Sequence, residues 1–335
     1  MLKQVCAPGK LILSGEHSVV HGAPALALAV DRHMRVSFEP DRLPRLSWQA
    51  REKTHVLGFD KFHSLRTRLD SYFERYLRGE LSIGQILKKP AELVFYAVDM
   101  ARLLSGLEHL HGGRVRIDSD IPIGAGMGSS AALIACLLKL FGEFEQIDDL
   151  VQQVRHCERL QHGQGSAIDA ATVCHGGLVR LRDGAVSRLP LAEQGLGEGW
   201  FWVFTGTPAS STGACVERVR QNFTGSAIWN EFAVVTHAME QALLQGGDLI
   251  ALVRENHRLL TRIGVVPAPL ARLAEQVEQQ GGAAKICGAG SVSGDQGGLM
   301  LVFLPAGTPE VLQLAPGWRW GKLKEERQGV HWLES

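Results

Sequence analysis

The stretch DIPIGAGMGSSAALIACLLKL, from Asp120 to Leu140, sets glycines at alternate positions, then two serines, then an apolar run of helical character. Glycine lets the backbone come close to a ligand, and the free amides and positive dipole end of a following helix favour a phosphate. The spacing is not that of the dinucleotide fingerprint, and the stretch lacks the lysine of a Walker A loop. It predicts an anion-binding loop before a helix over 129–141, with a plain connecting turn as the alternative. The glycines are Gly124, Gly126 and Gly128.

The composition of the 335-residue chain favours a small partner. Lys plus Arg equals Asp plus Glu, at 35 each, so no charge excess indicates nucleic acid or an anionic membrane. No apolar run reaches the length of a signal peptide core or a membrane span, which predicts a soluble, cytoplasmic chain. The six cysteines are scattered without metal-ligand spacing, so we expect buried free thiols.

Apolar periodicity predicts strands mixed with helices, grouped as α+β layers. Residues 3–38 read as two strands, the second with alternating Met34, Val36 and Phe38. The stretch from residue 39 to about residue 82 is rich in charged residues, and its secondary structure can be assigned only coarsely. Further elements are expected as helices near 91–104, 148–163, 229–244, 248–263 and 270–280, and as strands near 114–120, 200–205 and 299–304.

A break in composition at RLPLAEQGLGEGW, over 188–200, interrupts this pattern with glycine, proline and charge. It predicts a boundary between an N-terminal domain over 1–188 and a C-terminal domain over 198–335. The length of the chain also favours two domains over one.

Glu158 stands in the apolar stripe of the helix expected from Asp148, four residues after Val154. A carboxylate on a buried face is costly unless a cation or hydrogen bonds meet it. Glu158 is therefore either a metal ligand or half of a structural pair with an arginine.

Candidate residues for phosphoryl transfer surround the glycine loop in the sequence. PGKLILSGEH carries Lys10, Glu16 and His17, and HGQGSAID carries Asp169. The reaction needs a phosphate cradle, a magnesium held by oxygen atoms, a cation at the transferring group and a carboxylate at the attacking hydroxyl. Asp169 has a structural alternative, because Ser166 three residues earlier fits a helix capping box.

Three motifs together resemble the GHMP small-molecule kinases nearly from end to end: APGKLILSGEHSVVHGAPALALAV, PIGAGMGSSAA and GGAAKICGAG. The resemblance implies a two-domain α+β fold, with an N-terminal domain like ribosomal protein S5 and a C-terminal ferredoxin-like domain. It also implies that the glycine loop wraps the triphosphate of ATP with bound Mg²⁺. The loop residues so implicated are Gly124, Ala125, Gly126, Met127, Gly128, Ser129 and Ser130.

Within the family, GEH, ERLQHGQGSAID, the turn TPASST and RENHRLLTRIGVVPAPL look most like segments of mevalonate kinases. This implies ATP-dependent phosphorylation of the primary hydroxyl of mevalonate to 5-phosphomevalonate. It further implies that Lys10 and Asp169 are the catalytic pair. Ser130 and Glu158 would hold magnesium, and Glu16, His17 and Thr212 would face the hydroxyl and carboxylate end of the substrate.

Two departures from the family pattern leave the acceptor open. The usual HG-x-P-S-G-x-D reads HGQGSAID, and SVSGDQGG, with Asp295, interrupts the glycine run after the third motif. The alternatives are a phosphomevalonate kinase, another GHMP kinase such as galactokinase, and a catalytically silent binding protein. In each case the expected partners are ATP or another small molecule, without nucleic acid or membrane, and with a homodimer as an option.

Overall fold

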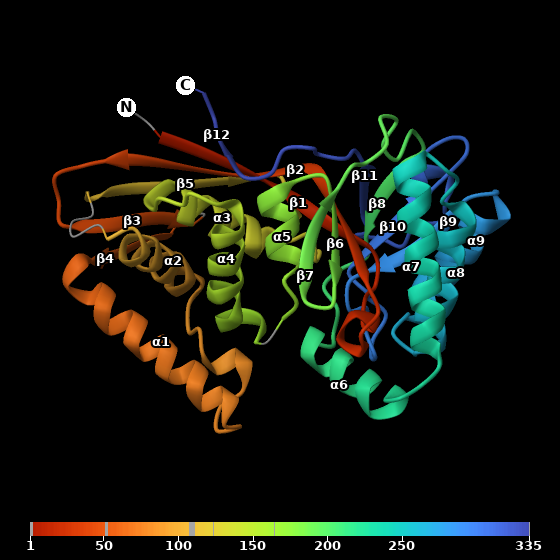
Figure 1. The fold of residues 1–335 in the computed structure, drawn as a ribbon, viewed down its shortest axis with the longest axis horizontal. Coiled ribbons are helices and arrows are strands. Elements are labelled where there is room, and N and C mark those ends of the chain that lie inside the picture. The colour runs from red at the N-terminus through yellow and green to blue at the C-terminus, as the bar shows by residue number, and fades with distance from the viewer. Residues whose placement is uncertain (1–2, 51–52, 107–110, 123, 164, 335) are drawn as a thin grey trace.

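The computed structural model describes residues 3–50, 53–106, 111–122, 124–163 and 165–334. Within these ranges the chain builds two sheets, each covered by helices (Figure 1). The larger has the order β12-β1-β2-β5-β3-β4, with β6 pairing with β2 and β7. Its strands are β1 (Lys3–Ser14), β2 (Ala25–Pro40), β3 (Arg45–Ala50), β4 (Lys53–Gly58), β5 (Gly113–Ser119), β6 (Leu178–Arg182), β7 (Ala185–Leu189) and β12 (His331–Trp332).

The second sheet is antiparallel in the order β11-β8-β10-β9 and is formed by the C-terminal part of the chain. Its strands are β8 (Trp200–Phe204), β9 (Ala283–Cys287), β10 (Leu299–Phe303) and β11 (Arg319–Lys322). The segment over 190–199 contains no helix or strand. The chain then returns to the first sheet, where β12 pairs with β1. The domain division expected at 188–198 stays a prediction.

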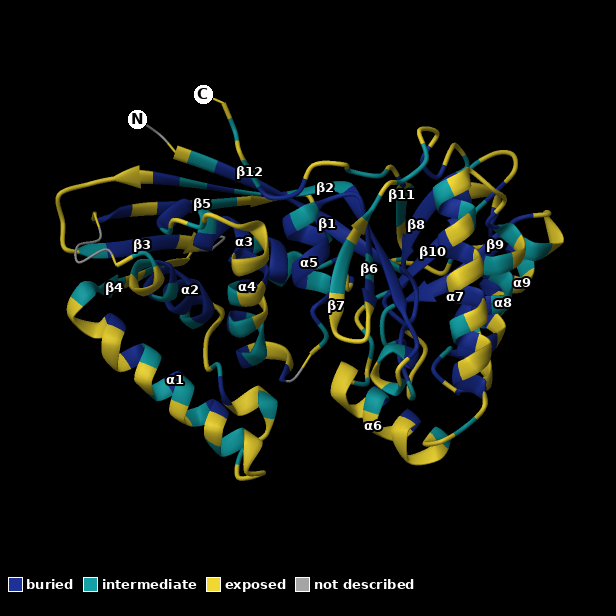
Figure 2. Cartoon of the chain, viewed as in Figure 1, coloured by how far each residue is buried: buried dark blue, intermediate teal, exposed yellow. Residues whose placement is uncertain are grey.

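Helices cover both sheets (Figure 1). α3 packs on β1 and β2 and also contacts α2, α4 and α5. Figure 2 shows dark, buried residues along the faces where these layers meet. The helices are α1 (Phe62–Leu77), α2 (Pro90–Leu104), α3 (Ser129–Phe141), α4 (Ile147–His162), α5 (Ile168–His175), α6 (Thr212–Phe223), α7 (Ile228–Gln245), α8 (Ile250–Arg262) and α9 (Ala268–Gln279).

The elements predicted from periodicity are confirmed, and α3 begins and ends where the sequence placed it. Met34, Val36 and Phe38 are buried in β2 as alternation requires. The sequence reading did not identify α1, whose narrow buried stripe stands among charged, solvent-facing residues. All six cysteines are free and buried, as expected. No helix among the described residues is long and apolar enough to cross a membrane.

Candidate active site

The glycine loop lies against β1. The backbone amide of Lys10 donates to the carbonyl of Met127 at 2.9 Å. Gly128 has a φ of 76°, and a Cβ there would lie 2.8 Å from Cγ of Lys10. Glycine is therefore needed at 128 both for the left-handed turn and for the passage of the lysine side chain. The first and second sequence motifs meet at this contact.

The loop leads directly into α3, whose N-cap residue is Gly128. No side chain caps this end, so the first amides of the helix are free to bind an anion. Ala125 and Met127 are buried and anchor the loop in the core. The region Gly124–Ser130 thus has the geometry of a phosphate cradle, with buried apolar side chains on one side and free helix amides at its end.

Lys10 and Asp169 form an ion pair, with Nζ and Oδ1 2.9 Å apart. The Lys10 side chain is only 4 % exposed and that of Asp169 is 35 % exposed. A buried ammonium needs such a partner. The capping-box alternative for Asp169 is wrong, because α5 begins at Ile168 with Ala167 as N-cap and no side-chain cap. Asp169 is held instead by the lysine of the first motif.

Glu158 lies near the same pair. Burial, and after it the charge of Asp169, raises the pKa of Glu158 to about 8, against a smaller lowering effect of Lys10. Among the described residues no arginine forms an ion pair with Glu158, and its neighbour Arg159 pairs with Asp70 instead. The structural-pair alternative therefore has no partner in the described part of the chain.

Ser130 lies on the Glu158 side of α4. Its Oγ donates to Oε1 of Gln161 at 3.0 Å, and Gln161 is three residues after Glu158 on the same helix. In the described ranges no group of three or more His, Cys, Asp or Glu side chains could hold a metal ion. A divalent ion here would have to complete its coordination with ligand oxygens and water, as Mg²⁺ commonly does in kinases.

The third motif contacts the GEH turn, residues 15–17, through buried polar side chains. Lys285 in β9 pairs with Oε1 of Glu16, and His17 Nε2 donates to the carbonyl of Ala289 at 2.9 Å. Burial lowers the pKa of His17, which favours the neutral ring, and in a neutral ring that donates through Nε2 the other nitrogen, Nδ1, is an acceptor. Two buried acceptors of this turn, Oε2 of Glu16 and Nδ1 of His17, have no hydrogen-bond partner within the described part of the chain.

Thr212 is exposed at the first position of α6, and no described contact joins it to Lys10 or Asp169. The turn before it is fastened to the segment that interrupts the glycine run. There the Oγ atoms of Ser210 and Ser293 are 2.7 Å apart, and Ser291 Oγ donates to Ser210 Oγ at 3.2 Å. Asp295, in the same segment, is exposed and without a described contact to the Lys10–Asp169 pair.

Sequence reasoning assigned no role to two residues near this centre. Lys285 is a lone charge in an otherwise apolar strand, which is a local signal of a buried pair. His162 follows Gln161 at the end of α4. Burial of the imidazole ring lowers the pKa of His162, although part of the residue is exposed. The charge of Asp169 raises this pKa and that of Lys10 lowers it.

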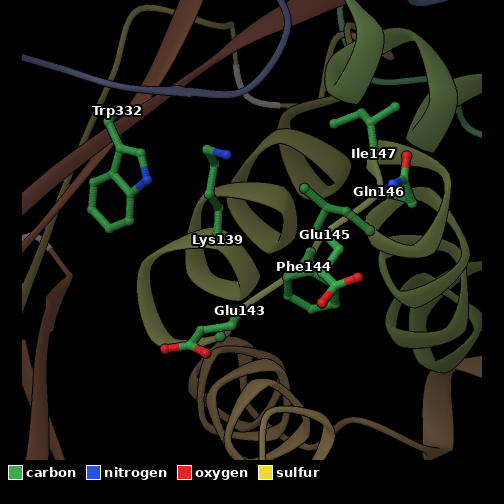
Figure 3. Close-up of a pocket in the computed structure, with 9 residues that line it drawn as sticks. Lys139, Glu143, Phe144, Glu145, Gln146, Ile147 and Trp332 are labelled. Carbon is green, nitrogen blue, oxygen red and sulfur yellow. The ribbon is translucent and has the colours of Figure 1, made fainter.

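A separate cavity of about 460 Å³ lies at the C-terminal end of α3, the end opposite the glycine loop (Figure 3). Lys139 and the residues after α3 line it together with Trp332. Because α3 has 13 residues, the two ends lie about 20 Å apart. This cavity is therefore not the phosphate cradle.

Comparisons with known proteins agree with this arrangement. The family model "GHMP kinases N terminal domain" matches residues 92–177. The chain is similar to the mevalonate kinases of Thermococcus sibiricus, at 31 % identity over 91 % of this chain and 90 % of that one, and of Thermococcus onnurineus, at 30 % identity with the same coverage. The crystal structure of the Methanococcus jannaschii mevalonate kinase superposes with a TM-score of 0.76, at 19 % identity over 97 % of this chain and 98 % of that one.

The structural likeness establishes the fold, and the sequence relatives span both halves of the chain. The chain therefore belongs to the GHMP kinase family and is an ATP-dependent kinase of a small molecule.

Proposed function

We propose that the chain phosphorylates the primary hydroxyl of mevalonate with ATP and gives 5-phosphomevalonate. The relatives named mevalonate kinase support this acceptor, because their similarity covers nine-tenths of the chain. The observation that carries the chemistry is the Lys10–Asp169 ion pair, placed where Lys10 also touches the glycine loop. One lysine thereby lies beside both the phosphate cradle and a carboxylate.

In the proposed reaction Asp169 accepts the proton of the attacking hydroxyl, or orients that hydroxyl for attack. Lys10 stabilises the negative charge that develops on the nucleophile and on the γ-phosphate. The partial exposure of Asp169 leaves room for the acceptor, while Lys10 is held inside the protein. The amides after Gly128 bind the phosphates of ATP.

Ser130 Oγ and Glu158 would hold Mg²⁺ on the phosphates. The carboxylate of Glu158 has no ion-pair partner among the described residues, and the Ser130 hydroxyl contacts Gln161, three residues further along the same helix. Both groups are oxygen donors of the kind that this ion prefers. When bound, Mg²⁺ neutralises charge on the β- and γ-phosphates.

The acceptor end of the site would be the GEH turn and the start of α6. Glu16 Oε2 and His17 Nδ1 can only accept hydrogen bonds, so they suit hydroxyl groups of the substrate. They do not suit its carboxylate. Thr212, with a hydroxyl and a position at a helix N-terminus, is the better candidate for the carboxylate end.

The test is ADP release with mevalonate, phosphomevalonate, homoserine and galactose offered separately. Turnover with mevalonate at a kcat/KM at least about 100-fold above the others is expected, a preference of some 2.7 kcal/mol. Preference for phosphomevalonate would replace the acceptor but keep the kinase assignment. No turnover with any acceptor would contradict the proposed function.

A further inference from the structure

Lys285 is buried completely, at 0 % exposure, in the strand that leads into the third motif. Its Nζ contacts Oε1 of Glu16 and donates to the carbonyl of Ile12 at 3.2 Å. The side chain therefore reaches from the second sheet to β1 and to the GEH turn. Glu16 is also buried, and its second oxygen has no hydrogen-bond partner among the residues that the structure describes.

Lys285 Nζ, which contacts Glu16, also lies 4.0 Å from the Sγ of Cys287. The Cys287 thiol has its pKa raised to about 11, first by burial, and the charges of Lys285, Glu16 and Lys10 all act on it. The Cys287 carbonyl in turn lies 4.0 Å from where a Cβ of Gly126 would be. Cys287 therefore lies close both to the Glu16–Lys285 pair and to the phosphate loop.

A buried carboxylate oxygen without a partner is costly, so its retention calls for a reason. We infer that Lys285 is a positioning residue for the acceptor substrate: it holds Glu16 through Oε1 so that Oε2 accepts a hydrogen bond from a substrate hydroxyl. This inference rests on the proposed function, because it names what the acceptor presents to the GEH turn. His17, fixed through Nε2 by Ala289, offers Nδ1 beside it in the same way.

The competing explanation is that the pair only fastens the two halves of the molecule together. A second ion pair gives a matched control for that role. Arg180 in β6 and Glu240 in α7 pair at 2.8 Å, and the Glu240 side chain is 6 % exposed. Its Oε2 likewise has no hydrogen-bond partner in the described ranges. This pair also links the first sheet to a C-terminal helix, but neither residue belongs to a sequence motif of the site.

The experiment compares Lys285→Gln with Arg180→Gln in steady-state kinetics with mevalonate and ATP. Each change leaves one buried glutamate without its cation. Loss of a hydrogen bond to a charged group is expected to raise the KM for mevalonate about 10-fold or more in Lys285→Gln. The KM for ATP should stay within about 2-fold, because the phosphate cradle is built from other residues. Arg180→Gln should leave both KM values near those of the wild type.

A double variant separates positioning from folding. In Glu16→Gln/Lys285→Gln neither charge is left unpaired, so the protein should fold even where Lys285→Gln alone does not. Its KM for mevalonate should equal that of Glu16→Gln alone, because Lys285 acts only through Glu16. The inference is overturned by a further 10-fold rise in the double variant, or by equal rises in both KM values for Lys285→Gln. If the wild type phosphorylates mevalonate, either of these results overturns only the role of Lys285. If the wild type does not, the proposed function itself fails.

Discussion

Lys10 and Asp169 differ in how far their side chains are exposed, and that difference supports the separate roles proposed for them. The ammonium is enclosed, with 4 % of the side chain exposed, while the carboxylate keeps 35 %. A fixed cation next to an accessible carboxylate gives a preorganised electrostatic site that an acceptor hydroxyl can reach. Glu158 adds a third titratable group, whose carboxyl, at neutral pH and without metal, is held largely in its neutral, protonated form.

Glu158→Gln tests the role of that carboxyl, because glutamine keeps its shape and removes its charge. The pKa of Glu158 rises from 4.5 to about 8 on folding, so its contribution to stability is lost as the pH rises through that window. The variant should therefore be at least as stable as the wild type at pH 8, measured by thermal unfolding. Its turnover should fall at ordinary magnesium and recover in part at higher magnesium.

The opposite pattern would contradict the assignment of Glu158. Turnover that persists at ordinary magnesium, together with a lower melting temperature, would make the residue structural. Glu145→Gln, a change at an exposed glutamate beside the distant cavity, is the control for loss of a carboxylate.

The element that positions the chemistry is α3 with its preceding loop. Its apolar residues are buried between the first sheet and the neighbouring helices, so the end that begins at Ser129 is fixed in space. The amides at that end stay uncapped, which is costly for a helix end unless an anion binds there.

Gly128→Ala tests how closely the glycine loop packs against the side chain of Lys10. An alanine there takes a φ of 76°, which costs about 1–2 kcal/mol, and its Cβ would lie 2.8 Å from Cγ of Lys10. We expect kcat to fall by 10-fold or more, roughly 1.4 kcal/mol in the barrier, because Lys10 must move.

Gly184→Ala is the matched control, since Gly184 has a φ of 78° and nothing lies within 4 Å of its Cβ position. It should lose similar stability, measured by urea unfolding, and keep kcat. Equal losses of kcat in the two variants would mean that the contact with Lys10 is unimportant.

Local patterns were sufficient to predict most elements, because α3, β1 and β2 carry dense apolar periodicity. Local patterns did not predict α1, because only a narrow stripe of apolar residues on this helix is buried. At the site, Lys10 and Asp169 were predicted as partners through the family resemblance, and their contact is found. The Glu16–Lys285 pair was not predicted, because its members are 269 positions apart and no local pattern encodes such a pairing.

At the scale of the whole molecule, helices α7 and α8 of the C-terminal half are joined to the end of β1 by polar contacts. Asn256 in α8 donates to Ser14 Oγ at 2.8 Å, and Ser14 Oγ lies 2.7 Å from Thr236 Oγ1 in α7. The GEH turn follows directly, so the C-terminal helices help to fix the turn that we propose as the acceptor end of the site. His257, beside Asn256, is buried in the same region.

His257 makes the stability of the molecule depend on pH. Burial, with the charges of Lys285 and Arg258, lowers its pKa from 6.5 to about 4. Its contribution is present above pH 6.5 and is lost as the pH falls toward 4, because the unfolded state then binds a proton that the folded state excludes. His257→Gln should reduce the pH dependence of the unfolding free energy in that window by up to about 1.4 kcal/mol per pH unit. Identical slopes for wild type and variant in urea unfolding at pH 7 and pH 5 would refute this.

The central claim is that the Lys10–Asp169 pair transfers phosphate from ATP to mevalonate, and Asp169→Asn tests it most directly. Asparagine keeps the volume and cannot take the proton. The measurement is the rate at which mevalonate gains a phosphate, followed by mass spectrometry, beside ATP affinity determined by titration. We predict phosphorylated mevalonate from the wild type, a rate several orders of magnitude lower from Asp169→Asn, and near-normal ATP binding in both. A variant that forms the product at a near-normal rate would contradict the account.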